Sequence, residues 1–352
     1  MTPIYEYLTE EILLEEKRKA RAIRHKAGRY VMTNGILYKR SFLGLWLGCV
    51  GPLQANYILR EIHEGSCNMH ADLRSVVAKA LRSGYYLPTM HTDARKLIRE
   101  YSSCQVHHPV PRNPQQKLTP ITSPWPFYKW GIDIAGPFLE GHGKVKFLIV
   151  AIDFFTKWIE EKPVATITGA QIKKFAWDNI VYRFGLPGEI ISDNGKQFKD
   201  NPFKDWCKKL CIRQCFASVK HPQANGLVER ANRSLGGGIK ARLDEKSKNW
   251  MEEISHVLWA HRTMIKSSNE ETPFSLTYGT KAVILVEIDM LTLRTTEVDM
   301  IKNDEAMEIN LDLLEERREQ ATIQEAKSKA KIEKYYNARV RNISFRPGDL
   351  VY

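Results

Sequence analysis

A short acidic turn after an apolar run is the feature that most constrains how this chain folds. Residues 190–195 read Ile-Ile-Ser-Asp-Asn-Gly, so a β-branched pair leads directly into Asp193, Asn194 and Gly195. A continuous β-branched run is typical of a buried strand, and Asp-Asn-Gly is typical of a turn. The pattern therefore predicts that Asp193 stands at the C-terminal end of a buried strand, where binding sites of such sheets are usually found.

Two further carboxylates lie in segments of different periodicity. A helical pattern begins near Gln223, and Glu229 lies near the edge of its apolar stripe. We therefore expect Glu229 to face inward although it is charged. Upstream, residues 130–138 (WGIDIAGPF) read as a second strand with Asp133 in its middle.

Asp133, Asp193 and Glu229 would converge on hard cations if two strands and a helix bring them together. Such a cluster repels itself without metal, which favours two Mg²⁺ or Mn²⁺ ions that clamp the attacking and leaving oxygens of a phosphodiester displacement. Plainer interpretations stay open for each residue alone. An isolated Asp-Asn-Gly is usually a hairpin turn, and an inward-facing helical Glu is usually half of an ion pair.

The order of eight motifs resembles the integrase of gypsy-class LTR retrotransposons, plant members especially, from about Gly28 to Tyr352. The motifs are LREIHEGSCNMH, GYYLPTM, WGIDIAGPF, ISDNGKQF, HPQANGLVERANR, VLWAHRT, ETPFSLTYG and RPGDLVY. The resemblance implies an RNase H-like core in which Asp133, Asp193 and Glu229 bind divalent metal and join element DNA to target DNA.

Charge and hydropathy narrow the class of protein. The 352 residues contain 53 Lys and Arg against 41 Asp and Glu, and the formal net charge of +12 favours a polyanionic partner over a merely soluble basic protein. Hydrophobic residues make up 43% of the chain, enough for cores in two or three domains. The longest apolar runs, 42–53 and 147–155, are too short to span a bilayer, so no membrane segment is expected. Without a signal-peptide pattern or dense Cys, an intracellular, reducing compartment fits best.

Two small elements are expected at the N-terminus. Residues 1–27 are rich in Glu, Lys and Arg, with acids before bases, which predicts a solvated helix or linker. Residues 28–53 contain YVMTNGILYKR, a hairpin signal about Asn34-Gly35, and predict a small β element.

Residues 54–108 have a helical pattern and contain part of a zinc-ligand motif. The resemblance implies a His-His-Cys-Cys module, whose matching ligands here are His63, His70 and Cys104. The first Cys position holds Tyr101 instead, and a structural zinc site needs four ligands. His107 is a candidate substitute. The alternative is that these histidines are ordinary helix residues, so zinc binding stays open.

A Pro-rich linker at 109–126 precedes the predicted core at 127–285. Strands are expected near 129–138, 146–154, 157–164 and 212–217 and in a run ending at Ser192, and helices near 169–184 and 201–210 and from about 223 and 250. Strands first, then alternation with helices, predict an α/β sheet covered on its faces. This matches the RNase H-like order that the resemblance implies: a mixed five-stranded sheet with flanking helices, preceded by the small helical zinc-finger-like module and followed by a long helix.

Amide and basic side chains lie next to Glu229 in sequence and are candidate nucleic-acid contacts. Such groups suit phosphates and base edges, and the resemblance places element-end DNA there. They are Lys220, His221, Gln223, Asn225, Arg230 and Arg233. The plainer interpretation is that 222–226 is only a loop and helix cap. Further along, Gly236–Gly238 predict a kink or an early end of the helix, since each Gly costs about 1 kcal/mol relative to Ala.

Residues 286–342 predict a charged helical connector, and residues 343–352 resemble the first strand of a small β-barrel that the resembled family places after the core. The whole is interpreted as an integrase region of a longer polyprotein, which would carry out metal-dependent end processing and strand transfer into target DNA. Its partners would be DNA and further copies of the chain, and it would act in the nucleus. Two rivals stay open: a truncated, catalytically inactive nucleic-acid-binding remnant, and a related RNase H-like nuclease or transposase.

Overall fold

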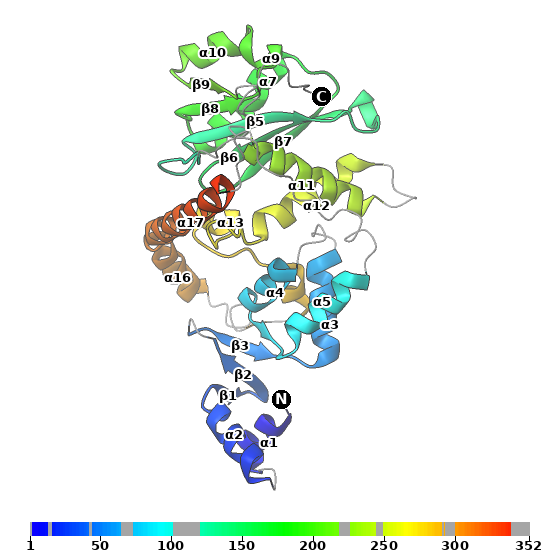
Figure 1. Cartoon of the computed structure of the whole chain (residues 1–352), viewed down its shortest axis with the longest axis vertical. Coiled ribbons are helices and arrows are strands. Elements are labelled where there is room, and N and C mark those ends of the chain that lie inside the picture. The colour runs from blue at the N-terminus through cyan, green and yellow to red at the C-terminus, as the bar shows by residue number, and fades with distance from the viewer. Residues whose placement is uncertain are drawn as a thin grey trace, which may run out of the picture. The chain divides into compact units, whose positions relative to one another are not determined.

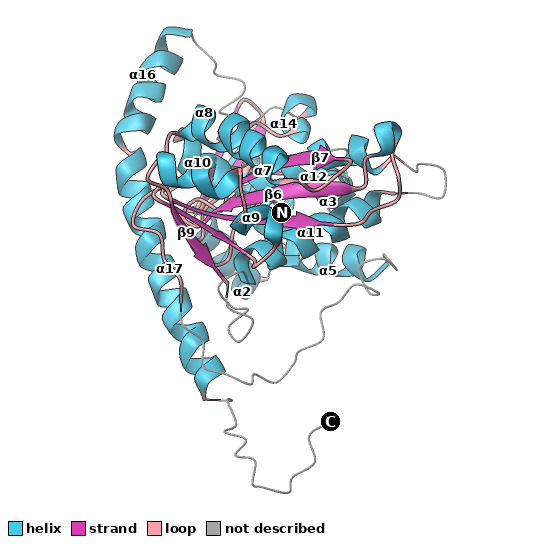
Figure 2. Ribbon diagram, turned by 90° about the horizontal axis from the view of Figure 1, so that it is seen from above, coloured by secondary structure: helices cyan, strands magenta, loops and turns pink. Residues whose placement is uncertain are grey.

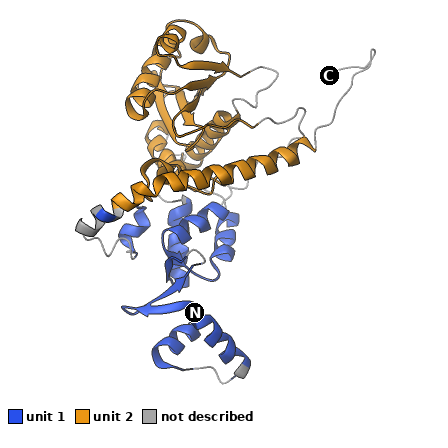
Figure 3. Ribbon diagram, turned by 90° about the vertical axis from the view of Figure 1, so that its left-hand side faces the viewer, with its two compact units in different colours: residues 1–106, 282–306 blue, residues 107–281, 307–352 orange. Residues whose placement is uncertain are grey.

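The structure, a computed structural model, divides into two compact units (Figure 3). It describes residues 2–12, 16–41, 44–64, 73–100, 120–217, 226–243, 249–290, 292 and 300–338. Unit 1 comprises residues 1–106 and 282–306, and unit 2 comprises residues 107–281 and 307–352. The sequence pattern predicts a domain boundary between residues 285 and 286. Residues 282–306, which span this position, belong to unit 1.

The predicted hairpin of unit 1 is confirmed. β1 (Tyr30–Thr33) pairs antiparallel with β2 (Ile36–Arg40), and Asn34 and Gly35 between them have φ values of 50° and 77°. Two consecutive positive φ values give the tight turn that matches the twist of paired strands. β3 (Trp46–Cys49) continues the sheet antiparallel to β2, and β4 (Tyr85–Tyr86) joins β3 in parallel.

Helices supply the apolar core of unit 1. Those described are α1 (Thr2–Glu10), α2 (Lys17–Ala27), α3 (Pro52–Glu64), α4 (Leu73–Arg82), α5 (Met90–Glu100) and α14 (Leu285–Asp289). Ile58 of α3, Val76 of α4 and Ala94 of α5 are completely buried in one cluster. α14 adds Val286 to this cluster, and its carbonyl accepts a hydrogen bond from the Tyr85 hydroxyl at 3.2 Å. The helical pattern predicted from residue 54 onward is confirmed in the described part of that segment.

Unit 2 contains the predicted mixed five-stranded sheet. In the described chain its strands are β5 (Lys129–Ala135), β6 (Phe147–Asp153), β7 (Ile159–Val164), β8 (Glu189–Ser192) and β9 (Arg213–Phe216), in the order β7-β6-β5-β8-β9 (Figure 1). β5, β6 and β7 form an antiparallel meander with the 3₁₀ turn η1 (His142–Lys144) between the first two, whereas β8 pairs in parallel with β5 and β9. Parallel pairing needs helical crossovers, which explains why helices alternate with strands after β7. The α/β fold class is confirmed.

Helices cover both faces of this sheet (Figure 2). One layer consists of α7 (Gly169–Phe175), the π-helical turn η2 (Ala176–Val181), α8 (Tyr182–Phe184), α9 (Lys196–Lys199) and α10 (Phe203–Lys209). The other contains α11 (Gly226–Arg242), with α12 (Trp250–Thr263) packed beside it. Successive side chains of β5 point to opposite faces of the sheet, so each helical layer packs against every second residue. Trp130 and Ile132 pack in one core with Phe175 of α7, whereas a Cβ added at Gly131 would lie 2.2 Å from Val228 of α11.

The predicted early end of the helix at Gly236–Gly238 is wrong. α11 continues through all three glycines to Arg242. Val228, Leu235 and Ile239 on this helix are buried, and packing of that face offsets the low helix propensity of glycine.

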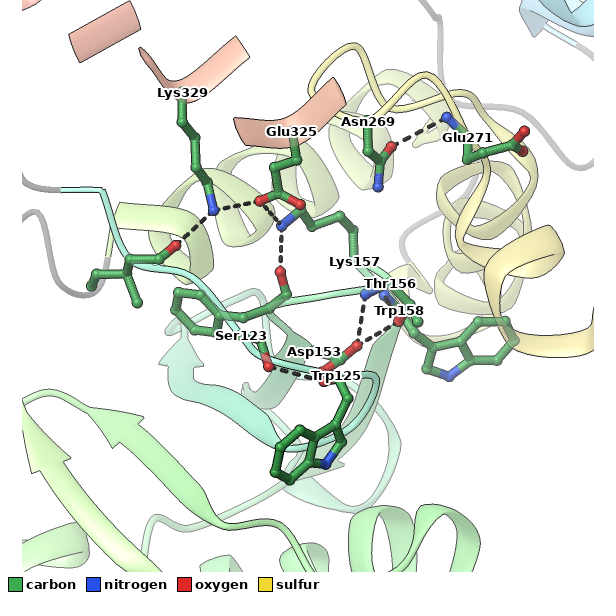
Figure 4. Close-up of polar contacts among 12 residues, drawn as sticks. Ser123, Trp125, Asp153, Thr156, Lys157, Trp158, Asn269, Glu271, Glu325 and Lys329 are labelled. Carbon is green, nitrogen blue, oxygen red and sulfur yellow. Dashed lines mark hydrogen bonds and ion pairs between the residues drawn. The ribbon is translucent and has the colours of Figure 1, made fainter. Parts of the chain in front are cut away.

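A long helix follows the core, as predicted. α16 (Met300–Asp312) leads into α17 (Leu314–Asn337), which packs on α13 (Pro273–Tyr278) and is fastened to unit 2 by polar contacts (Figure 4). The ammonium of Lys157, in the buried turn after β6, lies 2.8 Å from the Glu325 carboxylate. Lys329, one helical turn further, donates to the Ile121 carbonyl at 2.7 Å. The segment around Ile121, which precedes the sheet, and α17, which follows it, are therefore both held near the turn that contains Lys157.

Among the described residues, no helix is both long and apolar enough to cross a bilayer.

Candidate active site

Asp133, on β5, and Asp193, directly after β8, occupy equivalent positions relative to two neighbouring parallel strands. The register pairs Gly131 of β5 with Ile191 of β8, and each aspartate follows its strand's paired residue by two positions. Residues two apart in a strand face the same side, so Asp133 faces the α11 layer like Gly131. Parallel pairing therefore brings the two aspartates to one edge of the sheet.

The turn after β8 holds Asp193 in place. Its Oδ1 accepts a hydrogen bond from the backbone N–H of Gly195 at 2.9 Å, the local bond that favours Asp at the start of a turn. Asn194 donates from Nδ2 to the Ala217 carbonyl at 2.6 Å, and Ala217 donates its N–H to the Ser192 carbonyl at 2.8 Å. The acidic turn is therefore tied to the end of β9.

Asp133 is half-buried, and two donors hold its carboxylate. Oδ1 accepts from the backbone N–H of Ile134 at 2.8 Å, and Oδ2 accepts from Nδ2 of Asn232 at 2.9 Å. Burial raises the pKa of Asp133 to about 6, the negative charges of Asp193 and Glu229 add to the rise, and the two hydrogen bonds oppose it. The three carboxylates are thus close enough for their charges to interact.

Glu229 lies in the first turn of α11, and its side chain is exposed. The expectation that it faces inward is wrong, because Val228 and Ala231 form the buried face of this turn and Glu229 falls on the solvent side of that stripe. Its charge nevertheless contributes to the raised pKa of Asp133. Glu229 therefore borders the site from its open side.

Asn232 is a site residue that the sequence patterns do not single out. Its amide donates to Asp133, while its own Oδ1 is buried and has no hydrogen-bond partner in the described chain. A buried amide oxygen without a partner is uncommon and marks a place for a water, an ion or a ligand atom. The available sequence signal is spacing, since Asn232 follows Glu229 by three residues and so occupies a neighbouring position on the same helix.

The donor chemistry of the three carboxylates suits a divalent cation. Oxygen ligands from Asp and Glu are those that Mg²⁺ and Mn²⁺ prefer, and part of the raised pKa of Asp133 comes from repulsion that a cation would relieve. Among the residues that the structure describes, however, no group of three or more His, Cys, Asp or Glu side chains is placed to hold a metal ion. Metal binding by Asp133, Asp193 and Glu229 stays a prediction.

Two of the candidate nucleic-acid contacts, Arg230 and Arg233, lie in the described chain. Both are exposed on α11 next to Glu229, and the Arg233 Nε–H donates to the Glu229 carbonyl at 3.4 Å. The other four, Lys220, His221, Gln223 and Asn225, lie outside the described residues.

Of the predicted zinc ligands, His63 lies in the described chain, where it is completely buried in α3. His70 and Cys104, the other expected ligands, lie outside the described residues, as do Tyr101 and His107. Zinc binding stays a prediction.

Comparison with known proteins finds a match to an integrase family model in this part of the chain. Residues 124–222 match the family model described as "Integrase core domain", a range that includes Asp133 and Asp193 and ends before Glu229. The curated relatives include the Transposon Tf2-3 and Tf2-4 polyproteins of Schizosaccharomyces pombe (strain 972 / ATCC 24843), each 25% identical over 304 residues. Each match covers 84% of this chain and 21% of the polyprotein, so the chain spans about a fifth of the length of these relatives.

Solved structures also match, with TM-scores below 0.5. A chain of the simian T-cell lymphotropic virus intasome in complex with PP2A regulatory subunit B56 gamma matches with a TM-score of 0.41 and 20% identity, over 61% of this chain and 73% of that chain. The HTLV-2 integrase catalytic core domain in complex with magnesium (trimeric form) matches with a TM-score of 0.36 and 20% identity, over 43% of this chain and 97% of that chain.

Proposed function

We propose that this chain, whose residues 124–222 match integrase core domains, joins the DNA of a gypsy-class element to target DNA. The reaction has two steps: hydrolysis at the end of the element DNA, then attack of the exposed 3′-hydroxyl on a phosphodiester of the target. Asp133, Asp193 and Glu229 are the proposed catalytic residues.

One observation carries this proposal. Asp133 on β5 and Asp193 directly after β8 each follow a register pair of these neighbouring parallel strands by two residues, and the charges of Asp193 and Glu229 both help to raise the pKa of Asp133. Phosphoryl transfer depends chiefly on positioning and charge stabilisation and needs little covalent chemistry from the protein. A cluster of carboxylates at a sheet edge supplies the ligands that such charge stabilisation requires.

A divalent cation bound by these carboxylates would stabilise the charge that develops on the attacking and leaving oxygens. The side chains around the carboxylates orient them. Asn232 restrains one oxygen of Asp133, and the Gly195 N–H restrains one oxygen of Asp193, so the remaining lone pairs keep a defined direction. Arg230 and Arg233 carry exposed positive charge on the same helix, where they would neutralise backbone phosphates.

A strand-transfer assay tests the proposal. The purified chain is incubated with element-end oligonucleotides, supercoiled target DNA and Mn²⁺, and the joined product distinguishes integration from hydrolysis by a related nuclease. We expect joining by the wild type and a loss of about 100-fold or more for D193N and E229Q, because each removes a charged metal ligand. The matched control is D205N, which neutralises an exposed acid of α10 and should leave joining within about twofold.

The outcomes separate the rival interpretations. Retained joining in D193N would refute the assignment of Asp193. DNA binding without any joining by the wild type would favour the inactive nucleic-acid-binding remnant, and cleavage without joining would favour a nuclease.

The proposal also covers partners and place of action. Element ends and target DNA are the substrates, and joining two ends to one target needs more than one active site, so an assembly of several copies is proposed. Chromosomal DNA as the target places the reaction in the nucleus.

A further inference from the structure

An exposed aromatic ring stands at the same edge of the sheet as the candidate active site. Phe216 is the last residue of β9, and 37% of its surface is exposed. By contrast, Phe198 of α9 and Phe203 of α10 are completely buried in the core. The Phe216 ring is therefore only partly used in packing and remains available to another molecule.

Backbone pairing fixes this ring relative to Asp193. Phe216 pairs in register with Ser192, the residue before Asp193. The next residue, Ala217, donates its N–H to the Ser192 carbonyl at 2.8 Å and accepts at its own carbonyl from Asn194 at 2.6 Å. Residues on both sides of Asp193 therefore hold the end of β9, so the ring and the carboxylate belong to one connected strand end.

A lysine lies over the ring. Nζ of Lys199 is 5.4 Å from the centroid of Phe216, within the range of a cation–π interaction. Lys199 is exposed and forms no ion pair within the described chain. Gln214 of β9 donates from Nε2 to the Phe198 carbonyl of α9 at 3.1 Å, which anchors the lysine-bearing helix to the strand that carries the ring. Positive charge and aromatic face are thus held together.

Strand alternation determines which way the ring faces. Gln214, two residues before Phe216, contacts α9, so Phe216 also faces the α9 layer. Asp133 instead contacts Asn232 of α11, on the other face. The ring and the carboxylates therefore share one edge of the sheet but face opposite sides. DNA whose reacting phosphate lies at the carboxylates would cross this edge, and a flanking nucleotide would reach the ring.

We propose that Phe216 and Lys199 bind one unpaired nucleotide of the DNA substrate, with its base stacked on the ring and its phosphate near the ammonium. Aromatic rings beside positive charges bind single-stranded nucleic acid in this way, because every base has a π face. The base is unpaired, because a base inside a duplex has no free face. The inference rests on the proposed function, since it names the part of the same substrate that flanks the reacting phosphate.

Binding in EDTA tests this contact without catalysis. The full chain is titrated with a duplex that ends in a short single-stranded overhang and with its blunt counterpart, and 2-aminopurine in the overhang reports stacking by fluorescence quenching. We expect Phe216→Leu to weaken overhang binding about tenfold and to remove the quenching, while blunt-duplex affinity changes less than about twofold. Phe216→Trp keeps both signals. Lys199→Gln lowers the log–log salt slope by about one.

Tyr182→Leu is the matched control, because Tyr182 is 82% exposed on α8, which precedes β8 and so lies toward the opposite end of that strand. Overhang binding that is equal in wild type and Phe216→Leu overturns the proposal, and so does an equal loss in Tyr182→Leu. If circular dichroism shows that Phe216→Leu does not fold, Phe216→Trp and Lys199→Gln decide the question. A chain that binds the overhang through Phe216 yet joins no DNA refutes the proposed function alone.

Discussion

Neutralising Asp133 should stabilise the metal-free fold at neutral pH. A carboxyl group whose pKa is higher in the folded than in the unfolded chain stabilises the fold only while it is protonated. For Asp133 this contribution is complete below the ordinary value of 3.8 and is lost as pH rises through about 6. Above that pH the folded chain carries a half-buried charge, which Asp133→Asn removes.

The size of the effect follows from the pKa and the contacts. A rise from 3.8 to about 6 corresponds to about 3 kcal/mol at 1.36 kcal/mol per pH unit, and solvent screening of this half-buried group reduces it to about 2 kcal/mol. The new amide cannot accept both existing hydrogen bonds, and losing the one from Ile134 costs about 1 kcal/mol. The net gain is about 1 kcal/mol at pH 8, or about 2–4 °C in melting temperature for a unit of this size.

Thermal melting in EDTA at pH 8 and pH 4.5 measures this gain. At pH 4.5 the folded wild type is mostly protonated at Asp133, the penalty falls to about a third, and the advantage of Asp133→Asn disappears. D205N, which removes an exposed charge on α10, should shift melting little at either pH. A lower melting temperature for Asp133→Asn at pH 8, or a difference that does not change with pH, would refute the reasoning.

Three further changes test other parts of the structure. Asn232→Leu removes an amide that stabilises ionised Asp133, so the pKa of Asp133 rises and the acid limb of the pH–rate profile should move to higher pH; an unchanged limb would count against this role. Glu325→Gln removes the negative charge that pairs with the buried Lys157 ammonium. It should lower the free energy of unfolding, measured in urea, by about 3 kcal/mol and speed amide exchange in α17. An unchanged urea midpoint would show that the fold does not need this ion pair. Tyr101→Cys should tighten zinc binding by a peptide spanning residues 54–110, whereas equally tight titration of the unchanged peptide would show that a fourth ligand lies elsewhere.

Local chemistry was enough to predict the strands next to the two aspartates, whereas the mixed five-stranded order was an implication of the family resemblance. The apolar β-branched run before Asp193 predicts a buried strand, and Asn194-Gly195 predicts the turn that ends it. Once the strand that carries Asp133 pairs in parallel with this one, backbone register alone brings the two acids to the same edge. None of these steps requires knowledge of a distant side chain.

Long-range contacts could not be predicted in this way. The hydrogen bond between Asn232 and Asp133 joins residues 99 positions apart, and the contact between Lys157 and Glu325 joins residues 168 positions apart. No local period encodes such pairs, because they depend on which helix face meets which strand. The exposure of Glu229 has a similar cause. Val228, one residue earlier on α11, is buried, so a shift of one residue around the helix decides between the buried face and the solvent side.

Glycine in α11 illustrates how packing overrides propensity. Gly236 and Gly237 each cost about 1 kcal/mol relative to Ala, and no atom lies within 4 Å of a Cβ added at either, so close packing does not require them. The helix stays continuous because Leu235 before them and Ile239 after them are both buried. Because the turns on both sides are held by packing, the glycine turn between them continues the helix.

The glycine that does matter to the site lies in β5. A Cβ at Gly131 would sit 2.2 Å from Val228, so the absence of a side chain there allows α11 to approach the sheet closely. Asn232 lies one turn beyond Val228 on the same helix and reaches Asp133 two residues beyond Gly131 on the same strand face. A side chain at Gly131 would push α11 away from β5, and Asn232 would move away from Asp133 with it. The close approach of α11 at Gly131 therefore permits the 2.9 Å contact between the amide and the carboxylate.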